Sequence, residues 1–116
     1  MSRSVITINP LSEFNSGVAI SKDVIDSASG HTMDISGYPD QDIQVFMEVN
    51  DDPLIFTVNA GDFERSVLGD LDILVGADEL QVVTLESSRF NTVSGMIDID
   101  IASGVGTGNI FATGGL

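Results

Sequence analysis

The segment QVVTLESSRFNTVSGMIDIDI, residues 81–101, is the most regular part of this chain and decides its fold class. Its second half alternates between two faces of an extended strand. One face would carry Met96, Asp98 and Asp100, and the other Ile97, Ile99 and Ile101. The polar residues between the two halves predict a turn. We therefore expect two β-strands here, each with one wet and one buried face.

The same pattern continues through the rest of the chain. Further strands are predicted at residues 4–9, 18–20, 32–35, 42–50, 54–60, 71–75 and 108–113. This regular spacing predicts an all-β fold, a single antiparallel β-sandwich or small β-barrel of about seven to nine short strands. At most one or two helical turns are expected. Residues 1–116 would form a single β domain, with residues 1–10 as a candidate N-terminal arm.

Local signals refine this expectation. Pro10 should end the first strand, and the polar residues of 21–30 favour a loop over a short helix. Residues 42–50 and 54–60 are separated by a short turn, which predicts a hairpin. Residues 63–68 predict one helical turn, with Asp62 as its cap and Gly69 as its exit. In the first of these strands, Ile43, Val45, Met47 and Val49 should share one face, and Gln44, Phe46 and Glu48 the other. In the second strand, Leu54, Phe56 and Val58 are expected to point inward.

The charge of the chain restricts its partners. It has 18 acidic and 4 basic residues, a net charge of −14 at neutral pH. Nucleic acid and anionic membrane surfaces are therefore not expected as partners, because both are bound through Lys and Arg. There is no cysteine, which rules out disulfides and thiolate metal sites. The N-terminus shows no signal-peptide pattern, so synthesis in a cytoplasm is expected.

The sequence shows no recognisable set of catalytic residues. His31 is the one histidine, lacks recognisable catalytic partners, and is predicted to lie in a surface loop. Asp98 and Asp100 share a strand face at roughly 6.6–7 Å, which would suit a glycosidase pair or a cation site. The alternation of polar and apolar residues along a strand explains this pair of aspartates better, as part of the solvated face. We therefore predict no catalytic, cofactor-binding or metal-binding residues and no cofactor.

Three other features have a similarly plain interpretation. Carboxylate-rich turns at residues 23–26, 40–42, 50–52 and 70–72 lack the pattern of a calcium-binding loop. The glycines of residues 104–108 lack the lysine and the helix of a phosphate-binding loop. Arg89 is interpreted as an internal tie, because Glu86 is close in the sequence and many other carboxylates are available as partners.

Residues 41–116 resemble a known class of protein. The order runs from Glu48-Val49-Asn50 through Asn59-Ala60-Gly61-Asp62 and Gly69-Asp70-Leu71 to Leu85-Glu86-Ser87-Ser88-Arg89-Phe90 and the strand 95–101. This resembles small virion structural proteins of tailed bacteriophages, of the kind that decorate or cement the capsid.

The resemblance implies a non-enzymatic protein on the outer surface of the virion, bound to the major capsid protein. It also implies a homo-oligomer, with a trimer favoured. Another virion β domain, associated with the tail or a fibre, is one alternative. A cell-surface or carbohydrate-binding β-sandwich is another, although the chain has only one Tyr, six Phe and no Trp for a sugar platform. A carboxylate-based hydrolase is the least favoured interpretation.

Overall fold

The computed structural model describes residues 3–11, 17, 19–37, 43–102 and 106–115. Within them lie ten strands, one 3₁₀ helix and one short helical turn. The elements are β1 (Ser4–Val5), β2 (Ile8–Leu11), β3 (Asp23–Val24), β4 (His31–Asp34), β5 (Ile43–Val49), β6 (Leu54–Val58), η1 (Glu64–Leu68), β7 (Leu71–Val75), β8 (Leu80–Leu85), α1 (Ser87–Phe90), β9 (Met96–Ala102) and β10 (Gly108–Gly115). The predicted all-β fold class is confirmed.

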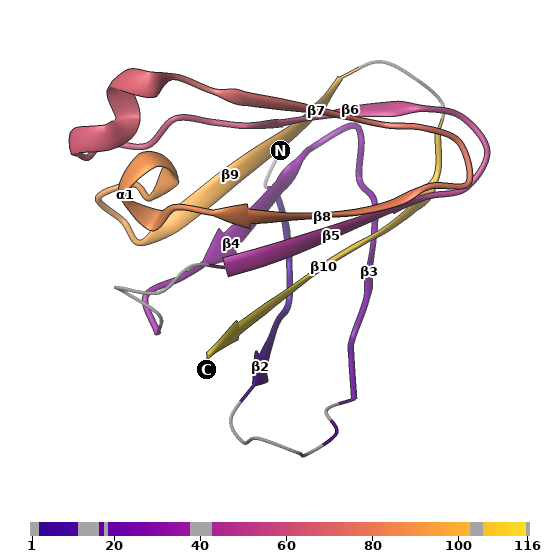
Figure 1. Cartoon of the computed structure of the whole chain (residues 1–116), viewed down its shortest axis with the longest axis horizontal. Coiled ribbons are helices and arrows are strands. Elements are labelled where there is room, and N and C mark those ends of the chain that lie inside the picture. The colour runs from indigo at the N-terminus through magenta and orange to yellow at the C-terminus, as the bar shows by residue number, and fades with distance from the viewer. Residues whose placement is uncertain (1–2, 12–16, 18, 38–42, 103–105, 116) are drawn as a thin grey trace.

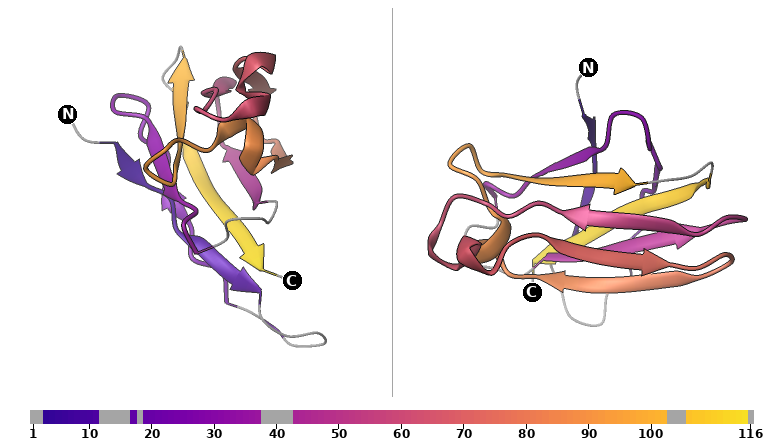
Figure 2. Two further views of the ribbon diagram at one scale, coloured as in Figure 1. Left: turned by 90° about the vertical axis from the view of Figure 1, so that its left-hand side faces the viewer. Right: turned by 90° about the horizontal axis from the view of Figure 1, so that it is seen from above.

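The strands form a sandwich of two sheets (Figures 1 and 2). Sheet A has the order β1-β4-β9-β6-β7, and sheet B the order β2-β10-β5-β8. The short strand β3 also pairs with β10, beside β2. The strand count exceeds the prediction because the first 24 residues contribute three short strands instead of two.

The core lies between the two sheets and is made of alternate residues from each strand. The predicted inward face of β6 is confirmed, and the four residues predicted to share one face of β5 form its buried face. In β9, Ile97 and Ile99 are fully buried, and Asp98 and Asp100 lie on the outer face. The period-two pattern in the sequence therefore located the core side of each of these strands.

The predicted hairpin between residues 42–50 and 54–60 is wrong. β5 belongs to sheet B, where it pairs with β8 and β10, and β6 belongs to sheet A, where it pairs with β7 and β9. The turn between them carries the chain from one sheet to the other. Both strands send alternate side chains into the same core from opposite sides, so their sequence pattern is the same as that of a hairpin.

The two strands of segment 81–101 are also in different sheets. β8 is an edge strand of sheet B, and β9 lies in the middle of sheet A between β4 and β6. The predicted turn between them includes the helical turn α1, whose Phe90 is buried in the core. Burial of such a ring stabilises the fold by about 1.5–3 kcal/mol, which anchors this crossing between the sheets.

The N-terminal segment joins both sheets. β1 pairs in parallel with β4 of sheet A, and β2 pairs in parallel with β10 of sheet B. Pro10 does not end the strand as predicted but lies inside β2. This is tolerated because β2 is at the edge of its sheet, where a missing N–H need not break the ladder. The described part of the candidate N-terminal arm, residues 3–10, thus lies within the sandwich.

The remaining local predictions have mixed outcomes. Residues 21–30 contain no helix, as predicted, but include β3. The helical turn at 63–68 is confirmed as η1, with Gly69 at its exit. Asp62 does not cap it; its carboxylate accepts a hydrogen bond from the Val93 N–H at 2.9 Å. Of the strand predicted at 18–20, Ile20 is not in a strand, and Val18 lies outside the described residues.

β10 is longer and more central than the short final strand predicted at 108–113. It pairs with β5 on one side and with β2 and β3 on the other. Gly108 makes its start possible, because a Cβ at this position would collide with the backbone carbonyl of Glu48 on β5. A glycine in a strand often marks such a close backbone approach.

Candidate functional site

His31 lies in the core and not in the surface loop that we predicted. It begins β4 and is fully buried, as are Met33 and Ile35 on the same face of the chain. Its Nε2 accepts a hydrogen bond from the Asp26 N–H at 2.9 Å, so the proton of the neutral ring resides on Nδ1. Extending the predicted strand 32–35 back by one residue would have placed His31 on the buried face, two positions before Met33.

The surroundings of His31 do not equip it as a general base. Burial lowers the pKa of the imidazole, which keeps it neutral near pH 7. Among the described residues, Nδ1 has no hydrogen-bonding partner, and the ring does not line either of the surface hollows described below. The buried position therefore indicates a structural side chain.

Asp98 and Asp100 are both bound by neighbouring side chains on the outer face of sheet A. Asp98 accepts a hydrogen bond from the Thr32 hydroxyl at 2.7 Å. Asp100 pairs with Arg3 at 2.6 Å and accepts a hydrogen bond from Asn59 at 3.0 Å. The bond from Arg3 is the main cause that lowers the pKa of Asp100. The two carboxylates fasten β9 to its neighbours, as expected of a polar strand face.

Arg3 itself was not recognised in the sequence. Besides Asp100, its guanidinium donates to the backbone carbonyl of Ile99 at 3.2 Å, and its Nε lies 4.0 Å from Asp98. This arrangement holds the start of β1 against β9, although the two strands are not paired. A single arginine near the chain start gives no local pattern that would reveal such long-range partners.

The other basic side chains are also bound within the molecule. Lys22 pairs with Glu48 at 3.3 Å and lies over the ring of Phe111. Arg65 pairs with Glu86 at 2.8 Å. All four basic residues of the chain therefore have internal partners, since Arg89 is bound as well.

Arg89 is an internal tie, but not to Glu86. Its Nε donates to the carbonyl of Gly69 at 3.1 Å, and its Nη2 donates to that of Asp70 at 3.2 Å. Its guanidinium also lies over the Phe90 ring, 4.8 Å from the centroid. The internal tie is made to backbone carbonyls and not to a carboxylate as expected; Glu86, the nearest candidate in the sequence, pairs with Arg65 of η1.

Among the described residues, four exposed carboxylates that form no ion pair lie at one end of the sandwich. The β5–β6 turn contributes Asp51 and Asp52, and the β7–β8 turn contributes Asp78 and Glu79, all of them exposed. The two turns are joined by a hydrogen bond from the Asp78 N–H to the Asn50 carbonyl at 2.9 Å. We call these four carboxylates the acidic end; it lies on the right of Figure 1, opposite η1 and α1.

The acidic end borders a surface hollow of about 210 Å³, lined by Glu48, Val49, Asn50, Asp78, Glu79 and Leu80. Within the described ranges, no group of three or more acidic or histidine side chains is arranged to hold a metal ion. The predicted turn at residues 40–42 lies outside those ranges. The negative electrostatic potential of the acidic end attracts cationic groups, but its described side chains do not form a preorganised metal-binding site.

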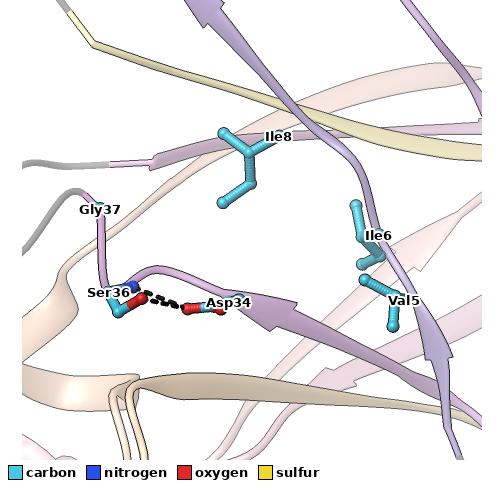
Figure 3. Close-up of a pocket in the computed structure, with 6 residues that line it drawn as sticks. All are labelled: Val5, Ile6, Ile8, Asp34, Ser36 and Gly37. Atoms are coloured by element: carbon cyan, nitrogen blue, oxygen red, sulfur yellow. Dashed lines mark hydrogen bonds between the residues drawn. The ribbon is translucent and has the colours of Figure 1, made fainter.

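A second hollow, of about 320 Å³, lies beside the N-terminal strands (Figure 3). It is lined by Val5, Ile6, Ile8, Asp34, Ser36 and Gly37. The Asp34 carboxylate accepts hydrogen bonds from both the hydroxyl and the N–H of Ser36, which lower its pKa. Asp34 and Ser36, the polar side chains among the described residues that line this hollow, are thus bound to each other.

The part of the chain that the structure describes includes no helix long and apolar enough to cross a membrane. Comparisons with protein-family models, with curated proteins and with solved structures gave no match.

Proposed function

We propose that this protein is a non-enzymatic virion structural protein that binds and stabilises the outer surface of a phage capsid. The major capsid protein would be its partner. The resemblance of residues 41–116 to capsid-decorating proteins motivates the proposal. The observation that carries it is the distribution of charge: all four basic side chains have internal partners, and four exposed carboxylates lie together at the acidic end.

Such a surface restricts the chemistry of its partner. A docking site for the acidic end would present Lys or Arg side chains, since like charges repel across an interface. His31 is buried and neutral, and Asp98 and Asp100 are each held by neighbouring side chains, which supports a binding role over a hydrolytic one. Attachment through the acidic end should weaken as salt is added, because exposed charges are screened over about 8–10 Å at physiological ionic strength.

The proposal is tested by mixing the purified protein with capsid shells that lack it and measuring co-sedimentation at increasing NaCl concentration. We expect saturable binding that weakens with salt. Cryo-electron microscopy of the virion should place the protein on the outside of the shell. Density found only in the tail, or no density in the particle, would contradict the proposal.

A pair of matched variants tests the role of the acidic end. Asp52→Asn with Asp78→Asn removes two charges there, and Asn tolerates the positive φ of 57° at residue 78. The control, Asp70→Asn with Asp72→Asn, removes two charges elsewhere and keeps oxygens that accept from the Ala60 N–H and the Thr57 hydroxyl. Only the first variant should bind shells more weakly, by roughly tenfold. An equal loss of shell binding in the two variants would mean that binding depends on net charge alone and not on the acidic end.

A further inference from the structure

The side of β8 that faces away from β5 is an open edge of sheet B. β8 is the last strand of sheet B, and in Figure 2 (right) it lies at the margin of the sandwich beside β7. Its sequence, LQVVTL, has no charged residue in a chain with a net charge of −14. We propose that β8 pairs with β8 of a second copy of this chain, antiparallel and about a twofold axis.

The hydrogen bonds of the β5–β8 ladder show which backbone groups are free. The Val49 N–H donates to the Glu79 carbonyl at 3.0 Å, whereas the Glu79 N–H donates to the Gly76 carbonyl. The single bond places Val49 and Glu79 at a hydrogen-bonded position that continues the register of the ladder. Such pairs alternate with non-hydrogen-bonded ones along an antiparallel ladder. The odd-numbered residues of β8 therefore face β5. The N–H and C=O groups of Leu80, Val82 and Thr84 point to the open side.

These three residues define one register that uses all of the free groups. Val82 lies opposite Val82 of the second copy, and Leu80 lies opposite Thr84 in both directions. Three hydrogen-bonded pairs would contribute about six intermolecular hydrogen bonds. The result is an isologous pair, in which sheet B continues into the same sheet of the second copy.

The side chains of this register are also compatible with a second copy. Leu80 and Val82 are 54% and 56% exposed, and pairing would cover apolar surface on both. On the outer face, Val82 lies opposite Phe46, which stacks on Phe111 with ring centroids 5.0 Å apart. No like charges meet within the six paired residues. The free groups of this strand are complementary to those of the same strand in a second copy, which favours a second copy as its occupant.

The other sheet edges carry features that oppose such pairing. On β7, the Leu74 carbonyl accepts a hydrogen bond from the Gln81 side chain at 2.8 Å, and Asp72 adds a charge. β2 contains Pro10, and β1 and β3 are only two residues long. Charges, prolines and short strands are the usual protection of edge strands against pairing with another chain. Among the described strands, β8 is the edge without such protection.

Light scattering and sedimentation equilibrium of the purified chain test the inference. We expect a dimer that tightens as NaCl rises, because salt screens the repulsion between two copies of charge −14. Val82→Lys and Val82→Glu should each weaken the dimer by roughly tenfold or more, because the twofold axis places two like charges opposite each other. An equimolar mixture of the two variants should form a dimer again, since the introduced ammonium then faces the introduced carboxylate across the axis.

Val24→Lys is the matched control. It adds the same charge at an exposed valine, 74% accessible, on the edge strand β3 of the same sheet, and should leave the dimer intact. A wild-type chain that stays monomeric at high salt, a trimer, or a dimer insensitive to Val82→Lys would each overturn the inference. Failure of the mixture to restore the dimer would also overturn it. These measurements need no capsid, so their outcome is separate from that of the proposed function.

Discussion

At the scale of single residues, the buried His31 should make the stability of the folded protein depend on pH. Its ring is held neutral by burial, with Asp26, Asp23 and Arg3 as the charged groups around it. Protonation at Nε2 would remove the acceptor for the Asp26 N–H. The folded protein therefore resists protonation of His31, whereas the unfolded chain protonates it near pH 6.5.

The sign of the resulting pH dependence follows from this difference. Because the pKa of His31 is lower in the folded state, its contribution is fully present above about pH 6.5 and is lost as the pH falls. The loss is at most about 1.4 kcal/mol per pH unit. The carboxylates with lowered pKa values, such as Asp26 and Asp100, contribute to the pH dependence only below about pH 4.5. The window between pH 7 and pH 5 therefore isolates His31.

Urea unfolding of the wild type and of His31→Gln between about pH 7.5 and pH 5 measures this effect. Gln retains an oxygen that can accept from the Asp26 N–H but does not titrate. The stability of the wild type should fall with pH more steeply than that of the variant. Equal slopes would mean that His31 takes up its proton equally in the folded and unfolded states.

At the scale of elements, Arg89 joins α1 to the chain between η1 and β7. Its two hydrogen bonds satisfy the carbonyls of Gly69 and Asp70, where the chain leaves η1. Removal of a charged donor from such carbonyls costs about 1–2 kcal/mol. Arg89→Ala should therefore lower the free energy of unfolding by about that amount.

Arg65→Ala is the comparison for Arg89→Ala. It removes an ion pair to Glu86 in which both side chains are about half exposed, so its loss should be smaller. Chemical denaturation of the two variants gives the difference directly. If Arg65→Ala were the more damaging change, the ion pair and not the carbonyl contacts would hold this corner.

At the scale of the whole molecule, net charge opposes folding. Eighteen acidic residues against four basic ones repel one another in the compact state, while the basic residues already have internal partners. Salt screens this repulsion more than it weakens a few surface ion pairs. The melting temperature should therefore rise with NaCl concentration.

Thermal unfolding of Val82→Lys from about 20 mM to 300 mM NaCl tests this expectation, because the inferred dimer is disfavoured in that variant. Adding Asp70→Asn and Asp72→Asn should reduce the rise, since less negative charge remains to be screened. A melting temperature that falls with salt would show that the ion pairs of Arg3, Lys22 and Arg65 outweigh the net repulsion.

The sequence by itself determined the class of the fold and the inward face of its longer strands. Alternation is local, so β5, β6 and β9 show which side chains enter the core without reference to any partner. The same pattern identified the polar face that carries Asp98 and Asp100. Composition alone likewise determined the acidic surface.

Only the tertiary structure decided which strands are neighbours. Two strands of one hairpin and two strands facing each other across a sandwich have the same alternation, so β5 and β6 could not be assigned to sheets from sequence. Likewise, β8 and β9 read as one continuous unit, yet β9 is central in sheet A and β8 is left at an open edge of sheet B. Pairing depends on backbone hydrogen bonds between distant segments, and these leave no local trace in the side-chain pattern.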